Sequence, residues 1–311
     1  MRFAVVNTIY KAALQNPNII FMTGDLSHAN ENEFRTNLPN QYINVGIAEQ
    51  NMIGIAAGLA LSGKKVFAYS IVPFVTMRCF EQVKSDLCYQ NLDVTLIGVG
   101  GGFIYGQYGN THCSIEDIAV MRVLPNMKIV CPANPLECEI LTKQIISLNG
   151  PTYIRIGRGK ESMPSNKYNV NFGKGYYVYK TGKIALFSYG TILSEAEKVV
   201  AALKLKSIDA QLINMHTIKP IDIDVIMNTL NSCDAIFTIE EHNIIGGLGS
   251  AIAEIISEVK QKPLLFKRFG VHDTYLKEIG TQDYLRDKHG ISAEKITEGI
   301  LSLLTKKLTY E

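Results

Sequence analysis

The 311-residue sequence lacks the features that mark several classes of protein. Lysine and arginine form no long run and the formal net charge is +2, so we expect no nucleic-acid-binding surface. The longest apolar run, IGIAAGLAL, is about half a membrane span. The N-terminal segment has no signal-peptide core or cleavage site, and its apolar spacing predicts an amphipathic helix. We therefore expect a soluble protein that does not enter membranes.

The six cysteines form no C-x-x-C pair, and most of them lie in apolar surroundings. Cysteines of this kind are typical of reduced core thiols in a cytoplasmic protein, and we expect no metal ligand in the chain. Hydrophobic residues make up 47% of the chain and charged residues 19%, which is a globular composition. A chain of this length predicts two domains, and its partners should be small molecules or other proteins.

Short apolar runs rich in β-branched residues alternate with helical patterns along the sequence. Such alternation predicts an α/β fold with parallel sheets covered by helices. We expect a doubly wound, mainly parallel sheet over residues 1–165 and a smaller α/β domain over residues 184–311. The polar, glycine-rich stretch between them predicts a linker over residues 166–183, with room for one edge strand.

Glu49 is the only formally charged residue between Ile43 and Ser62, a segment that otherwise predicts a buried helix. A buried carboxylate is costly unless it is paired or protonated. One interpretation is an acid in the first turn of a helix, at a partly exposed end, where the helix dipole favours it. The other is functional: its neighbours offer no basic partner, so this carboxyl group could exchange a proton with a ligand near neutral pH.

A glycine-rich loop, GGGFIYGQYGNTHCSIED, follows the apolar run VTLIGVG at residues 100–117. Ligands bind at the carboxyl ends of parallel strands, where this loop is expected. It matches neither of the common nucleotide-binding glycine motifs, so a nucleotide site has little support. His112 lies in this loop and could contact a ligand, or it could simply cap the loop.

Two further stretches carry candidate binding residues. In SIVPFVTMRCFEQ, Phe74 and Phe80 flank Arg78, and these aromatic rings could be core residues or could stack on a flat heteroaromatic ring. In RIGRG, Arg158 ends a predicted strand and could be a surface residue or could clamp an anion.

Taken in order, seven pieces of the sequence resemble the C-terminal half of transketolase and of 1-deoxyxylulose-5-phosphate synthase, which are thiamine diphosphate enzymes. The resemblance covers essentially the whole chain and implies a pyrimidine-binding domain followed by the family's C-terminal domain. The pieces are GDL, NVGIAEQN with AAGLALSGKK, the segment from Phe74 to Glu81, YGNTHCSIEDIAVMRVLPNMKIVCPANPLE, PTYIRIGRG, MHTIKPID and EEHNIIGGLGSAIAE.

The resemblance implies roles for the residues around the cofactor. Glu49 matches the glutamate that hydrogen-bonds N1′ of the aminopyrimidine and promotes its imino tautomer, which takes the proton from thiazolium C2. Phe74 matches the aromatic residue that stacks on the pyrimidine ring, and we place Arg78 and Phe80 in the same cofactor-binding segment. His112 matches a histidine that faces the substrate.

The resemblance also assigns substrate residues. Arg158 falls on the arginine that grips the substrate phosphate, and Arg2 is aligned with a second arginine. Tyr108 stands where the family has an acid, and Gly100 stands where it has a further histidine, so the sugar pocket departs from the family pattern. His242 is expected to serve structure and dimer contacts.

The family holds the cofactor diphosphate and Mg²⁺ with a GDG motif and a later asparagine, and TGDLSHAN has Leu26 in place of the second glycine. The resemblance therefore implies a split enzyme whose diphosphate-binding half is a separate N-terminal subunit. We expect a homodimer core or an α2β2 heterotetramer, with active sites between subunits.

The predicted function is transfer of a two-carbon ketol unit from a ketose or ketose phosphate to an aldehyde acceptor. One alternative is the β subunit of a 2-oxoacid dehydrogenase, or an enzyme similar to deoxyxylulose-phosphate synthase. An alternative of another class is a non-catalytic binding or regulatory subunit. The polar set Glu49 and His112, together with Phe74, favours an enzyme.

Overall fold

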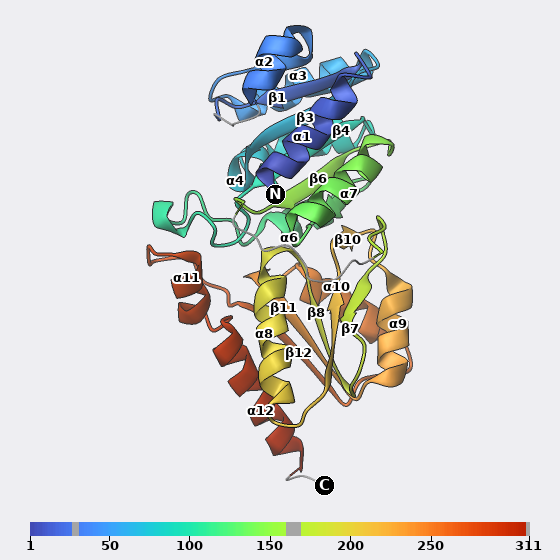
Figure 1. Cartoon of the computed structure of the whole chain (residues 1–311), viewed down its shortest axis with the longest axis vertical. Helices are drawn as coiled ribbons and strands as arrows, with labels where there is room; N and C mark the ends of the chain where they lie inside the picture. Colours follow the sequence, from blue (N-terminus) through green and yellow to red (C-terminus); the bar gives the residue numbers. More distant parts are fainter. Residues whose placement is uncertain (27–30, 160–168, 309–311) are drawn as a thin grey trace.

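The structure is a computed structural model that describes residues 1–26, 31–159 and 169–308. Two β-sheets with helices packed against them follow one another along the chain (Figure 1). Each sheet is parallel except for one strand at its edge. The expected α/β class with two mainly parallel sheets is therefore confirmed. The expected boundary between residues 165 and 166 lies outside the described residues.

The first sheet has seven strands in the order β10-β5-β6-β4-β3-β1-β2. Every residue of β1, β4 and β6 is buried, because helices cover both faces of a parallel sheet and each face then takes apolar side chains. The strands are β1 (Ile19–Thr23), β2 (Tyr42–Asn44), β3 (Lys65–Ile71), β4 (Val94–Val99), β5 (Lys128–Val130), β6 (Thr152–Ile156) and β10 (Thr217–Lys219).

Alternate residues of β1 pack on opposite faces of this sheet. Ile19 and Phe21 belong to the cluster formed with α1 and α7, whereas Ile20 and Met22 pack with α3. This alternation is the two-residue period of a strand. The helices and turns of this part are α1 (Arg2–Ala13), α2 (Glu31–Asn37), α3 (Glu49–Leu61), α4 (Val72–Val75), α5 (Phe80–Gln82), a π-helical turn (Val83–Cys88), α6 (Asp117–Arg122) and α7 (Pro135–Ile146).

The second sheet has the strand order β12-β11-β8-β9-β7, with β7 (Tyr176–Tyr179) antiparallel at one edge. Its other strands are β8 (Ile184–Ser188), β9 (Ala210–Asn214), β11 (Ala235–Asn243) and β12 (Leu265–Val271). The edge strand β7 lies in the stretch that the sequence analysis assigns to a linker.

The helices of the second part divide between the two faces of its sheet. Helix α12 lies along α8 on one face (Figure 1). On the other face α9 and α10 join the core of the first sheet, so one hydrophobic cluster is shared by both parts. No helix in the described ranges is long and apolar enough to cross a membrane. The helices of the second part are α8 (Leu193–Lys204), α9 (Ile223–Ser232), α10 (Leu248–Glu258), α11 (Gln282–Lys288) and α12 (Ala293–Leu308).

The segment DAQLINMHTI is divided between the two sheets. The Met215 amide donates to the Ser188 carbonyl at 2.8 Å, which keeps β9 beside β8. His216, the residue after Met215, already contacts the first sheet, because its carbonyl accepts a hydrogen bond from the Cys131 amide at 2.7 Å. Strand β10 then pairs antiparallel with β5. Residues of both halves are buried, so the sequence pattern alone does not mark the crossing from one sheet to the other.

Candidate functional site

Glu49 is the first residue of α3 and its side chain lies beside the ends of β1 and β3. A left-handed turn at Gly46 (φ 74°) leads the chain from β2 into the helix. A Cβ atom at Gly24, which follows β1, would lie only 3.3 Å from Glu49 Oε1, so the absent side chain leaves room for the carboxylate. The carboxylate is thereby buried, with 2% of the residue exposed.

Two side chains hold the Glu49 carboxylate. The Ser70 hydroxyl at the end of β3 donates to Oε1 at 3.0 Å, and Arg78 Nη1 donates to Oε2 at 2.7 Å. The sequence analysis expected no basic partner, and this expectation was wrong. Arg78 follows α4 and is far from Glu49 in the sequence, and only the folding of the chain brings it to the start of α3. The sequence neighbours of Glu49 therefore do not reveal the pair.

Arg78 and His112 both contact the ring of Phe74, which is half-buried in α4. The guanidinium carbon of Arg78 lies 3.8 Å from the ring centroid, in a cation–π arrangement. The His112 ring meets Phe74 edge to face, with 5.2 Å between centroids. The structure therefore brings Glu49, Phe74, Arg78 and His112 together.

A row of aromatic rings continues from His112 to the predicted substrate arginines. The His112 and Tyr108 centroids are 5.4 Å apart, and those of Tyr108 and Tyr105 are 5.9 Å apart. The guanidinium of Arg158 lies 5.3 Å from the Tyr105 ring centroid. Arg2 Nε in turn donates to the Arg158 carbonyl at 2.8 Å. We call this set the binding row; its members, in order of contact, are Glu49, Arg78, Phe74, His112, Tyr108, Tyr105, Arg158 and Arg2. The binding row contains all but one of the predicted site residues.

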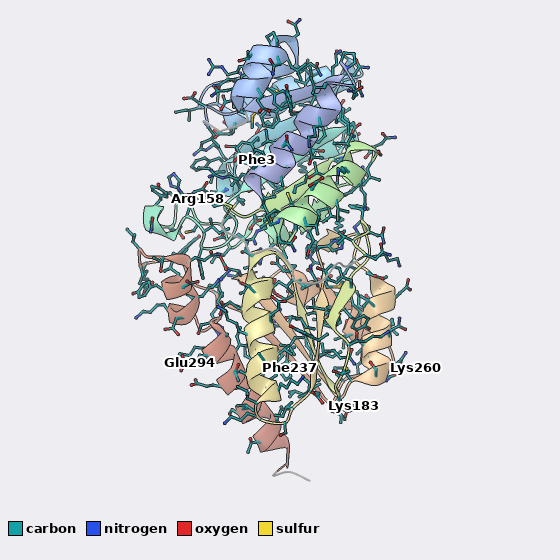
Figure 2. All side chains as sticks on the ribbon, viewed as in Figure 1. Phe3, Arg158, Lys183, Phe237, Lys260 and Glu294 are labelled. Atoms are coloured by element: carbon teal, nitrogen blue, oxygen red, sulfur yellow. The ribbon has the colours of Figure 1, made fainter. Side chains whose placement is uncertain are left out.

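Arg158 follows β6 and is exposed, beside the start of α1 that Figure 2 marks at Phe3. Burial raises the pKa of the Tyr105 phenol, while the nearby charges of Arg2 and Arg158 oppose that shift. Tyr105 is therefore neutral, and its phenol lies near the positive charges of Arg2 and Arg158 at this end of the binding row. An exposed guanidinium held in this way can bind an anion.

Phe80 is the predicted site residue that the structure does not bring into the binding row. Its half-buried ring packs against the main hydrophobic core. A cofactor contact of Phe80 stays a prediction. Tyr108, in contrast, lies within the row and is 55% exposed.

Tyr105 is a site residue that the sequence analysis did not single out. A Cβ atom on Gly100, whose φ is +85°, would overlap the Tyr105 ring. The ring thus fills the space of a side chain at position 100, where the resemblance noted in the sequence leads one to expect a histidine. The sequence feature that could have indicated Tyr105 is its position in the same loop as Gly100, five residues after it.

His242 has the structural role expected of it. Its ring is fully buried, Nε2 accepts a hydrogen bond from the Ala119 amide at 3.3 Å, and Nδ1 lies 2.7 Å from the Asn243 carbonyl. Burial lowers the pKa of His242 to about 4, so the ring is neutral. The buried His242 side chain thus joins β11 to α6, and the expected dimer contact stays a prediction.

The binding row offers a buried carboxylate, an aromatic face and a histidine at one end, and two arginines at the other. Such a set can bind a flat heteroaromatic ring, exchange a proton with it and hold an anion beyond it. Within the described ranges, no three histidine, cysteine, aspartate or glutamate side chains are placed to hold a metal ion.

Comparison with known families gives two matches in sequence order. Residues 1–162 match the pyrimidine-binding domain of transketolase, and residues 173–296 match the transketolase C-terminal domain. The chain is 38% identical over 271 residues to one of the subunits of the apulose-4-phosphate transketolase of Actinobacillus succinogenes, with 87% of each chain covered. It is 32% identical to a 6-deoxy-6-sulfo-D-fructose transketolase subunit of a Clostridium species, covering 99% of this chain and 95% of that one.

A solved structure with a similar fold is a split-gene transketolase described as an inactive β4 tetramer. It superposes with a TM-score of 0.86 at 32% identity, covering 98% of this chain and 97% of that chain. The similarity therefore extends over the whole length of both chains.

Proposed function

The chain belongs to the transketolase family, and from this premise we propose that it is the C-terminal subunit of a split, thiamine-diphosphate-dependent transketolase. It would transfer a two-carbon ketol unit from a ketose to an aldehyde acceptor. The observation that carries the proposal is the binding row, in which Arg78 links the buried Glu49 carboxylate to the half-buried ring of Phe74.

The residues of this chain fit the aminopyrimidine half of thiamine diphosphate. When bound, that cofactor supplies a nucleophilic thiazolium carbon that adds to a carbonyl group. Glu49 would hydrogen-bond N1′ of the pyrimidine and share its proton, and Phe74 would stack on the ring. A carboxylate with 2% exposure suits this role, because the dry surroundings strengthen the interaction between charge and ring.

We propose that the substrate is a sugar with an anionic group. Support comes from the relatives, one of which is named for a sugar phosphate and another for a sulfonated sugar. Arg158 is exposed at the rim of the site with Arg2 attached to its carbonyl, and His112 lies between these arginines and Glu49 along the row. His112 would face the reacting end of the sugar while Arg158 binds its anionic end.

We propose that a separate N-terminal subunit holds Mg²⁺ and the diphosphate. The A. succinogenes relative is named as one subunit of its transketolase, and the split-gene transketolase is described as inactive in its β4 form. The complete enzyme would then be an α2β2 heterotetramer with a homodimer core made of two copies of this chain. We also place the enzyme in the cytoplasm, which the six buried, unbridged cysteines support.

The family matches support the proposed division of the chain. We assign residues 1–165 to the pyrimidine-binding domain, 166–183 to the linker and 184–311 to the C-terminal domain. The family matches cover residues 1–162 and 173–296, so the second match begins within this linker.

The test is reconstitution with a separate N-terminal transketolase subunit that carries the diphosphate-binding domain, in the presence of Mg²⁺ and thiamine diphosphate. Ketose phosphates, unphosphorylated ketoses and pyruvate are compared as donors. We expect ketol transfer from an anionic ketose by the pair, and no turnover by the isolated chain. Use of pyruvate alone would favour a 2-oxoacid dehydrogenase or synthase, and no turnover with any donor would favour a non-catalytic subunit.

A further inference from the structure

Arg78 makes the two contacts that the proposed function assigns to the cofactor pyrimidine. Its guanidinium lies over the Phe74 ring at 3.8 Å, and its Nη1 donates to Glu49 at 2.7 Å. We propose that Arg78 is a latch that occupies the pyrimidine position in the free subunit and leaves when the cofactor binds. This inference rests on the proposed function and adds a conformational step to it.

Both oxygens of the Glu49 carboxylate are hydrogen-bonded and shielded from solvent while the latch is closed. Oε1 accepts from Ser70 and Oε2 accepts from Arg78, and only 2% of Glu49 is exposed. The Gly24 backbone lies close behind Oε1. Each oxygen could accept a second hydrogen bond, but the buried carboxylate is out of reach, so a ligand nitrogen can approach it only if a neighbouring side chain moves.

Arg78 is the partner that can move. Ser70 is fully buried at the end of β3, and its short side chain has no other place to go. The Arg78 side chain is 41% exposed and has several rotatable bonds. Displacement of Arg78 would uncover one oxygen of Glu49 and one face of Phe74 at the same time.

The guanidinium resembles the ring that would replace it. Both are flat, both stack on an aromatic face, and each can share a hydrogen between a nitrogen at its edge and the Glu49 carboxylate. The latch would thus keep the Glu49 charge paired and the Phe74 face covered before the cofactor arrives. Its cost is a lower cofactor affinity, because binding must first break the ion pair.

Substitution of Arg78 distinguishes a side chain that leaves when the cofactor binds from one that stays beside Glu49 in the loaded enzyme. If Arg78 leaves on binding, Arg78→Ala favours the cofactor, because nothing has to be displaced and Glu49 is left without its partner in the free state. If Arg78 stays beside Glu49 in the loaded enzyme and orients its carboxylate, the same substitution weakens cofactor binding. The two roles predict changes of opposite sign in the dissociation constant.

The experiment is calorimetric titration of the reconstituted enzyme with thiamine diphosphate in Mg²⁺ buffer. We expect the dissociation constant to fall about two- to fivefold in Arg78→Ala, as expected for loss of a half-exposed ion pair. The Arg78→Lys variant should bind with intermediate affinity, because lysine keeps the charge without the flat, forked guanidinium. Arg122→Ala breaks an Arg–Glu pair elsewhere, with Glu254, and should leave the constant unchanged.

A second readout follows Arg78 directly. Phenylglyoxal modifies free guanidinium groups, and peptide mass spectrometry reports the adduct at Arg78. We expect faster modification after thiamine diphosphate is added, because the released side chain is more exposed. Weaker binding by Arg78→Ala, or slower modification with cofactor, would overturn the latch while leaving the cofactor assignment in place. Absence of saturable binding in both wild type and Arg78→Ala would overturn the proposed function and the latch together.

Discussion

The rings of Phe74 and His112 meet edge to face with 5.2 Å between their centroids, although Phe74 follows β3 and His112 lies in the loop after β4. This contact joins the two ends of the binding row. On one side it leads through Arg78 to the Glu49 carboxylate, and on the other through two tyrosines to Arg158. One end is thus suited to a heteroaromatic ring and the other to an anion.

Phe74→Ala should weaken binding of thiamine diphosphate by the reconstituted enzyme about tenfold. The substitution removes the stacking face, and an aromatic pair contributes about 0.5–1.5 kcal/mol beyond the area that it buries. Titration calorimetry measures the change. Tyr89→Ala, at a tyrosine that is 87% exposed, is the control and should bind normally. Equal affinities in wild type and Phe74→Ala would remove Phe74 from the cofactor site.

Arg158→Ala should raise the KM for an anionic ketose donor by roughly 10- to 100-fold and change kcat little. A charge-assisted contact contributes about 1.5–3 kcal/mol, and here it holds a part of the substrate that does not react. Steady-state kinetics with matched phosphorylated and unphosphorylated donors measures the effect. Lys143→Ala removes an exposed cation of the same domain and should leave the KM unchanged. An equal rise with both donors would contradict an anion-binding role.

The buried pair of Asp117 and Arg155 supports the loop that carries His112. Arg155 Nε donates to Asp117 Oδ2 at 2.8 Å, and Nη2 of the same arginine donates to the Glu241 carbonyl of the second sheet at 3.1 Å. Asp117→Asn should lower the free energy of unfolding by about 3–5 kcal/mol, because it leaves a buried guanidinium unpaired. Denaturant titration measures the loss.

Glu254→Gln is the control for that substitution. It breaks the pair with Arg122, in which the glutamate side chain is 59% exposed, and should cost about 1 kcal/mol or less. Similar losses in Asp117→Asn and Glu254→Gln would contradict the structural importance of the buried pair.

The free energy of unfolding should decrease as the pH is lowered, because His242 is buried in its neutral form. Burial lowers the pKa of His242 from 6.5 to about 4, with the Asp117 charge opposing the shift. The folded state therefore disfavours protonation, so the contribution to stability is complete above pH 6.5 and is lost as the pH falls toward 4. The loss is about 3 kcal/mol at most. Unfolding measured from pH 7 to pH 4 should show a shallower decline in His242→Gln than in wild type, and parallel declines would contradict the assignment.

Most of the fold could be predicted because buried strands and helices carry continuous patterns. The all-buried strands β1, β4 and β6 appear in the sequence as apolar runs. Shorter or half-exposed elements carry no such pattern. The three residues of β2 are only partly buried, α6 has six residues, and β12 mixes exposed and buried positions, so these elements were not predicted.

The candidate site residues were identified from the sequence individually, whereas the contacts between them could not be predicted. Glu49 was identified as an acid in an apolar helix, but Arg78 reaches it only because α4 and the turn after it return to the start of α3. The replacement of a side chain at Gly100 by the Tyr105 ring is likewise a contact across a loop. Contacts of this kind depend on chain reversals that local patterns do not encode.

The role of Glu49 is tested most directly by the rate at which the thiazolium C2 proton of thiamine diphosphate exchanges with deuterium in the reconstituted enzyme. NMR after acid quenching gives this rate for wild type and for Glu49→Gln, with Glu81→Gln, at an exposed acid, as the control. We expect exchange to slow by roughly 10²- to 10⁴-fold in Glu49→Gln, the usual contribution of a positioned acid or base, and to be unchanged in the control. Exchange at the wild-type rate in Glu49→Gln, with cofactor bound, would contradict the account.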